Sequence, residues 1–357
     1  GALALTANTT GTVNTAVGKD SLTANTTGSY NVGMGVDSLL SNTTGDVNVG
    51  IGNNSLRANT TASQNTGLGT NAMYSNTTGA DNVAVGHNSL DANTTGSNNT
   101  ALGKSALGTN TTASENTAVG RDSLKLNTTG AANTASGYLA LTANTTGSSN
   151  SAFGKDSLSA NTTGSAHVAV GKDALKANTT GDNNTAVGMD ALTTNTTGGA
   201  NTAVGFAALD ANVSGSLNTA VGENALGANT TSNNTAIGHN AAAANTSGGN
   251  VVAVGYKALE SHTTANHVTA VGSEALKSNT TGGSNTAVGT GALDANTTAD
   301  NNTAFGYDAL GANTTGTRNV AVGVTSSNQI TTGSDNTAMG YDSLTRCTTG
   351  GTNVAIG

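Results

Sequence analysis

The chain has 357 residues, a net charge of −8, 49 Gly, no Pro or Trp, and only 3% aromatic residues. Scarce Lys and Arg argue against nucleic acid, whose affinity depends on clustered basic side chains. No apolar run approaches the roughly 20 residues that span a bilayer, so membrane insertion is not expected. The lone Cys347 excludes a disulfide framework within one chain.

The dominant feature is a 17-residue repeat. An anchor glycine closes the phrase N-T-A-V-G from Gly18 to Gly357 at intervals of 17, with one 16-residue interval between Gly222 and Gly238. Strict similarity at a short period is typical of stacked repeats that bury their apolar sides against their neighbours. We therefore expect residues 1–357 to be one continuous array, and an internal piece of a longer fibrous protein.

Each turn is numbered from its anchor glycine as position 0, and the consensus is G-x-x-[AS]-L-x-[AS]-N-T-T-[GA]-x-x-N-T-A-V. In chain order it predicts a strand at T-A-V-G, a G-x-x corner, a second strand around [AS]-L-x-[AS], and an N-T-T-G corner. The predicted fold is all-β, a parallel β-solenoid or β-roll of about 21 turns.

Two aliphatic rows are predicted to form the core. Position −1 is apolar in 20 of 21 turns, and position +4 is Leu in 18 of 21. Burying each large side chain stabilises the fold by about 1.5–3 kcal/mol. Asn occupies positions +7 and −4 in 18 turns each, which predicts inward hydrogen-bonded Asn ladders. The ladder positions include Val17, Leu22, Asn25, Leu39, Asn42, Val119, Leu124, Leu175, Asn178, Val204, Leu276 and Val288.

Small side chains recur at two further positions. Position +3 is always Ala or Ser, and position −2 is always Ala or Gly. Such residues indicate a close approach, either of a neighbouring chain or of the opposite wall of a narrow coil. The charged residues, Arg346 excepted, fall at positions +1, +2, +5, +11 and +12, which predicts the solvated exterior.

Two irregular turns test this scheme. The missing residue between Thr231 and Asn234 predicts one tightened corner without a break in the array. Ser327 replaces the position +4 Leu, and Ile330 replaces the position +7 Asn three residues later. We expect Ile330 to turn inward and partly fill the space that Ser327 leaves.

The N-T-A-V-G and N-T-T-G phrases resemble the shaft repeats of bacteriophage tail fibres and the head repeats of YadA-like trimeric autotransporter adhesins. The resemblance implies a left-handed β-roll in a parallel homotrimer, with small residues facing the threefold axis. It also implies an extracellular location, on a virion tail fibre or a cell surface. A host or surface receptor of glycan type would bind through regions outside this segment.

No catalytic constellation stands out, since the five His are spread over four turns, and we expect no enzyme activity and no cofactor. Asp at position +2, as in Asp156, Asp173 and Asp190, offers a calcium row, or a solvated row neutralised by Lys. The N-T-T phrase is also a glycosylation sequon, and its Thr columns invite an ice-binding hypothesis. The favoured function is a structural fibre shaft; the alternatives are an adhesin head or a free extracellular filament.

Overall fold

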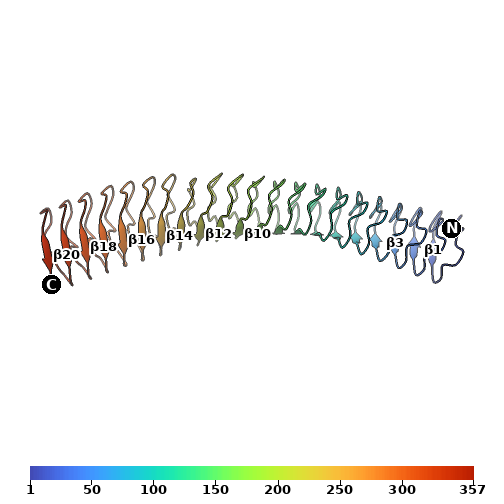
Figure 1. Ribbon diagram of the computed structural model, residues 1–357, viewed down its shortest axis with the longest axis horizontal. Coiled ribbons are helices and arrows are strands. Elements are labelled where there is room, and N and C mark those ends of the chain that lie inside the picture. The colour runs from blue at the N-terminus through green and yellow to red at the C-terminus, as the bar shows by residue number, and fades with distance from the viewer. The chain divides into compact units, whose positions relative to one another are not determined.

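The computed structural model describes residues 1–357 as two compact units, Gly1–Asp182 and Asn183–Gly357. Each unit is a parallel β-solenoid with one three-residue strand in each turn (Figure 1). The first unit contains β1 (Thr15–Val17), β2 (Val32–Met34), β3 (Val49–Ile51), β4 (Thr66–Leu68), β5 (Val83–Val85), β6 (Thr100–Leu102), β7 (Thr117–Val119), β8 (Thr134–Ser136), β9 (Ser151–Phe153) and β10 (Val168–Val170). The second unit contains β11 (Thr185–Val187), β12 (Thr202–Val204), β13 (Thr219–Val221), β14 (Thr235–Ile237), β15 (Val252–Val254), β16 (Thr269–Val271), β17 (Thr286–Val288), β18 (Thr303–Phe305), β19 (Val320–Val322), β20 (Thr337–Met339) and β21 (Val354–Ile356).

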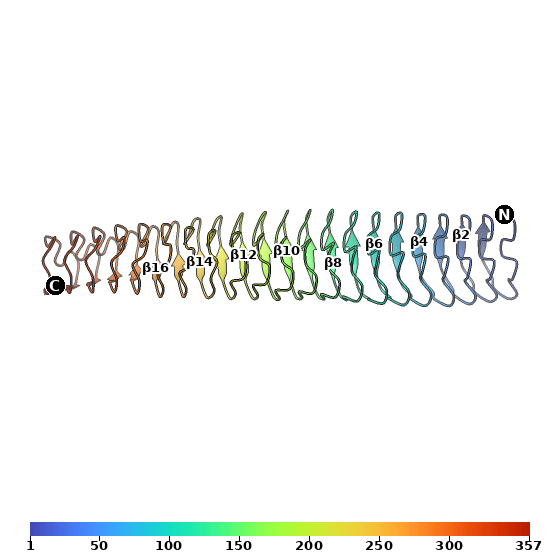
Figure 2. The same ribbon diagram turned by 90° about the horizontal axis from the view of Figure 1, so that it is seen from above.

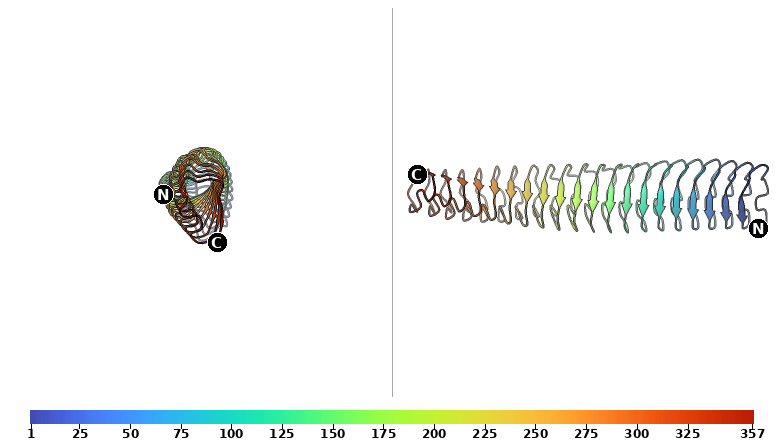
Figure 3. Two further views of the ribbon diagram at one scale, coloured as in Figure 1. Left: turned by 90° about the vertical axis from the view of Figure 1, so that its left-hand side faces the viewer. Right: turned by 90° about the horizontal axis from the view of Figure 1, so that it is seen from below.

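Within each unit, every strand pairs in parallel with the strand of the next turn. In the first unit the register joins Thr15 to Val32 and continues from β1 to β10. In the second unit Thr185 pairs with Thr202, and the same register continues from β11 to β21. The strand arrows of each unit accordingly point in one direction (Figures 2 and 3). The predicted parallel β-solenoid is confirmed.

The second predicted strand, around [AS]-L-x-[AS], is wrong. That segment is a series of turns, with Asp20 and Leu22 in the left-handed region at φ 55° and 52°. The left-handed residues let the adjacent Ser21 and Leu22 both point inward, whereas successive residues of a strand would face opposite sides. The turns still hydrogen-bond to each other, since the Leu22 N–H donates to the Ser38 carbonyl at 3.0 Å.

The core of each turn is built from position +4 and position −2. Leu22, Leu39, Leu124, Leu175 and Leu276 are fully buried, as the sequence predicted for the leucine row. The Ala or Gly at position −2 is also buried in nearly every turn. Because these two rows face each other across the coil, the interior is narrow and admits one large side chain per turn.

The second predicted core row, at position −1, instead lies on the outer side of the strands. Val17 is 52% exposed, and Val119, Val204 and Val288 are half-buried. Alternation along the T-A-V strand explains this correction, because Ala at position −2 points inward and its neighbours point outward. The aliphatic residues at position −1 still stack in register, but on the surface of the sheet.

The small residues at position −2 face the opposite wall of their own coil. A Cβ added at Gly50 would lie 2.7 Å from Ser38 Oγ and 3.2 Å from Leu39 Cγ. Ser38 uses the space by donating to the Gly50 carbonyl at 2.7 Å. The narrow coil therefore explains the small residues, and the alternative of a neighbouring chain at this position is not needed.

The two asparagine ladders are confirmed. Buried Asn42 donates to Asn25 Oδ1 of the preceding turn at 2.9 Å and to the Gly45 carbonyl of its own corner at 3.0 Å. At position −4, the backbone N–H of Asn48 donates to Asn31 Oδ1 at 2.9 Å. Each amide thus joins consecutive turns, and Asn178 occupies the same buried place as Asn25 and Asn42.

The anchor glycines are required by the backbone. Gly86 has φ +132°, and a Cβ there would lie 2.7 Å from the carbonyl oxygen of Gly103 in the next turn. Consecutive anchor glycines therefore stack too closely for any side chain, which a positive φ would also disfavour.

Both irregular turns behave as predicted. The short corner keeps the strands in register, with Thr219 paired to Thr235, while Asn229 donates to the Thr231 carbonyl at 2.8 Å. That carbonyl replaces the glycine carbonyl of the other corners. Ile330 is fully buried, as expected beside the small Ser327.

Candidate functional site

In each unit, the outer face of the strands is an uncharged surface. Positions −3 and −1 alternate with the buried position −2, and they carry Thr, Val and other uncharged residues in every turn. The most exposed residues at position −1 are Val17, Met34, Leu68, Leu102, Phe153, Val170, Ile237, Phe305, Met339 and Ile356. β-branched Thr and Val favour the strand conformation, so these residues both form the strand and make its surface apolar.

A second surface is the polar strip formed by positions +2 and +5. These positions are neighbours within a turn, because Asp122 and Lys125 form an ion pair at 3.1 Å and Glu274 and Lys277 form one at 3.2 Å. Asp173 lies between Lys172 and Lys176, at 2.9 and 3.0 Å. The hydrogen bond from Lys172 is the main cause that holds the pKa of Asp173 below its usual value, and the Lys176 hydrogen bond acts in the same direction.

Three other aspartates on this strip have a carboxyl pKa above its usual value. Burial raises the pKa of Asp91, Asp210 and Asp294, and hydrogen bonds from nearby backbone groups only partly offset it. All three occupy position +5, and no other turn has Asp there. In each case position +5 of the next turn is glycine, and these three are the only glycines at that position, namely Gly108, Gly227 and Gly311.

These glycines make room for other side chains. None of the three has a positive φ, so the backbone does not demand glycine there. In two turns the residue at position +2 fills the room: a Cβ at Gly227 would collide with Asn224 Oδ1, and one at Gly311 with Asp308 Oδ1. At Gly108 the residue at position +2 is the shorter Ser105, and the atoms nearest to a Cβ would be Ser105 O at 3.3 Å and Asp91 Oδ1 at 3.5 Å.

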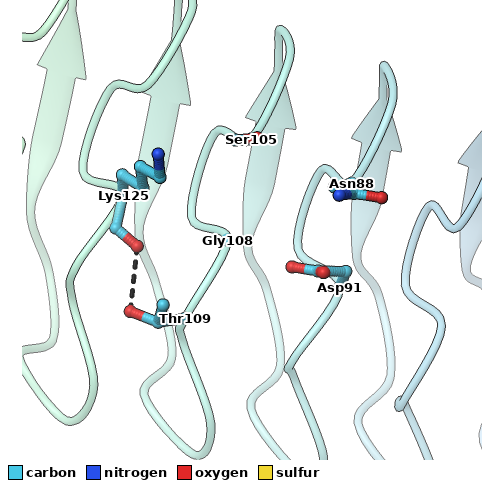
Figure 4. Close-up of a pocket in the computed structure, with 6 residues that line it drawn as sticks. All are labelled: Asn88, Asp91, Ser105, Gly108, Thr109 and Lys125. Atoms are coloured by element: carbon cyan, nitrogen blue, oxygen red, sulfur yellow. Dashed lines mark hydrogen bonds between the residues drawn. The ribbon is translucent and has the colours of Figure 1, made fainter.

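The space above Gly108 therefore stays open as a notch of about 280 Å³. Its lining residues are Asn88, Asp91, Ser105, Gly108, Thr109 and Lys125. The Asp91 carboxylate extends over the gap toward Gly108, with Asn88 beside it (Figure 4). Thr109 Oγ1 donates to the Lys125 carbonyl at 2.9 Å, which links the two turns on the far side of the notch.

The notch is not among the sites predicted from the sequence, although part of the pattern that forms it is visible there. The pairing of Asp at position +5 with Gly one turn later appears in the repeat alignment at three places. That Asn224 and Asp308 fill two of the gaps, while Ser105 leaves the third open, follows only from the side-chain positions.

The calcium hypothesis finds no cluster to support it. No group of three or more His, Cys, Asp or Glu side chains is arranged to hold a metal ion. Asp156 and Asp173 instead pair with Lys155 and Lys172, at 3.2 and 2.9 Å, as in the alternative of a neutralised row. The sequon asparagine Asn25 is fully buried and hydrogen-bonded, as are its counterparts in most turns.

Two histidines are built into the asparagine ladders. His262 occupies position +7, where its Nε2 lies 2.9 Å from the Ala265 carbonyl and its Nδ1 lies 3.1 Å from Asn279 Nδ2. A neutral ring with the proton on Nε2 satisfies both contacts, and burial is the main cause that lowers the pKa of His262. His167 takes position −4, where its backbone N–H donates to Asn150 Oδ1 at 3.1 Å.

The fold and the ladders define the class as a parallel β-solenoid repeat protein with a repeat of about 17 residues. Comparison with known protein families and with curated proteins gives no match to this chain. The structure contains no helix of the length and apolarity that crossing a membrane requires.

Proposed function

We propose that the chain is a structural shaft of an extracellular or virion fibre that presents a host-binding or surface-binding tip. The observation that carries the proposal is the uninterrupted stacking within each unit. In each unit every turn is joined to the next by strand pairing, and most turns are joined also by buried leucines and asparagine ladders. Such nearest-neighbour stacking suits a load-bearing spacer, since each turn stabilises the turns beside it. The resemblance to fibre and adhesin repeats supports the same role.

The proposal includes a parallel homotrimer of left-handed coils, as the resemblance implies, but with a different contact surface. The small residues at positions −2 and +3 are buried inside each coil, so they cannot face a threefold axis. In this proposal the uncharged strand face lies at the threefold axis instead. A three-residue strand about 10 Å long and a rung spacing of about 4.8 Å give roughly 50 Å² per turn. Two facing units of ten turns would then bury about 1,000 Å² in total, the minimum for a stable interface.

The test is the solution mass and scattering profile of the full chain. Sedimentation should give three times the 34.4 kDa of one chain. Small-angle scattering should show a rod-like regime, whereas a compact globule of this length would have a radius of gyration of about 20 Å and no such regime. Rod-like scattering at single-chain mass would overturn the trimer alone, and a globular profile would overturn the shaft.

A matched pair of variants tests the proposed contact surface. Val119→Lys and Val204→Lys together place one charge on the strand face of each unit and should lower the mass to that of one chain. Lys104→Ala with Lys277→Ala changes one exposed and one half-buried position off that face and should leave the mass unchanged. A trimer that survives the Val substitutions would contradict this choice of surface.

A further inference from the structure

The notch above Gly108 lies where an asparagine ladder at position +2 ends. Asn54 donates to Asn71 Oδ1 at 3.1 Å, and Asn71 donates to Asn88 Oδ1 at 3.1 Å. The next residue in this row is Ser105, so the Asn88 Nδ2 group has no protein acceptor. One amide donor is therefore left facing the notch.

An acceptor lies beside this donor. The Asp91 carboxylate has no ion-pair partner and points across the gap (Figure 4). Lys125, on the other side of the notch, is already paired with Asp122 at 3.1 Å. The Ser105 hydroxyl adds a group that can both donate and accept. The notch thus combines a donor, an anionic acceptor and a hydroxyl within a space of about 280 Å³.

We infer that this notch binds a saccharide through its hydroxyl groups. A hydroxyl both donates and accepts, so one sugar hydroxyl can donate to the Asp91 carboxylate and accept from the Asn88 amide. Hydrogen bonds to a charged carboxylate are the stronger kind, and they give such a shallow site its main attraction. A simple cation would pair with Asp91 but would leave the Asn88 amide without an acceptor. The volume is close to the lower end for small-molecule sites and suits a single sugar ring.

This inference places a receptor contact on the side of the array, in addition to any tip. It does not depend on the trimer or on the shaft, because every lining residue belongs to one chain and to consecutive turns. A failure of the sugar-binding test would therefore leave the proposed function standing, and a monomeric chain would leave this site intact.

The test is ligand-observed saturation-transfer NMR on the full chain, with methyl glycosides of glucose, galactose and mannose as probes. We expect at least one glycoside to bind with a Kd of about 1 mM. Its fully O-methylated analogue, which has no hydroxyl to donate to Asp91, should show no transfer. L-lysine serves as the cationic probe and should not compete. Absence of transfer for all three glycosides, or displacement of the bound one by L-lysine, would overturn the inference.

Two variants locate the binding. Ser105→Asn should abolish transfer, because the longer side chain fills the notch as Asn224 does above Gly227 and gives Asn88 its missing acceptor. Asn also tolerates the left-handed conformation at position 105, where φ is 55°, so folding should be preserved. Asp91→Asn should weaken binding by about tenfold or more through loss of charge-assisted bonds.

The matched control is Ala207→Asn, which makes a longer side chain at position +2 of a different turn. It should leave both binding and thermal stability unchanged. Transfer that persists in Ser105→Asn, with an unchanged melting temperature, would contradict the assignment of the notch.

Discussion

The inner wall and the strand face of each unit contain equally apolar rows but have different roles. Leu124 at position +4 is fully buried, whereas Val119 at position −1, five residues earlier, is half-buried on the strand surface. Both rows stack in register from turn to turn. Residue type and regular spacing are therefore not enough to identify the core of a solenoid, and the direction of each side chain decides which row stabilises the fold.

The largest expected difference comes from truncating one residue of each row. Leu124→Ala should cost about 2–5 kcal/mol, since it leaves a cavity in a narrow core. In the single chain, Val119→Ala should cost less than about 1 kcal/mol, because that side chain is already partly in water there. Denaturant unfolding of the two variants measures the difference. Equal losses would mean that the strand face is buried in the assembled protein, which would sharpen the proposed trimer contact.

The buried ladder residue His262 should make the stability of the fold depend on pH. The pKa of buried His262 is lowered, so the unfolded chain binds a proton at a higher pH than the folded chain does. The stability from neutral His262 is present above about 6.5 and is lost as the pH falls toward the lowered folded value. Protonated Nδ1 would face the Asn279 amide donor, at a cost of about 1–3 kcal/mol.

The matched variant for this effect is His262→Asn, which restores the ladder residue. Its stability should change little between pH 7 and pH 5, whereas that of the original chain should fall. Melting curves across this range measure both. A fall of the same size in the variant would assign the effect to other groups.

The smallest effect on stability is expected on the polar strip, where substitutions of two aspartates should change the stability in opposite directions. Asp173→Asn should destabilise the fold at pH 7, because a lowered carboxylate pKa contributes stability that is present above the unfolded value of 3.8. Asp91→Asn should stabilise it slightly, because a raised pKa means that folding disfavours the charged form. Each change should be within about 1 kcal/mol. Thermal melts at pH 7 check the signs, and two shifts in the same direction would contradict the assigned causes.

The ladder positions are the part of the structure that the sequence predicts best. The buried Leu and Asn rows and the tightened corner could be predicted because a packed interior or a fixed amide partner leaves few acceptable substitutes, and the repeats display that restriction 21 times. The notch could be predicted only in part. The Asp91 and Gly108 pairing is visible in the repeat, but the open space depends on how long Ser105 is relative to Asn224 and Asp308.

The sequence by itself determined the period, the parallel stacking, and which positions carry charge, because these follow from residue type repeated at fixed intervals. Tertiary structure alone decided which of the two apolar positions in T-A-V faces inward. Left-handed residues at Asp20 and Leu22 turn the chain so tightly that both Ser21 and Leu22 enter the coil. The remaining interior then accepts only Ala or Gly from the strand, and the larger Val must lie outside.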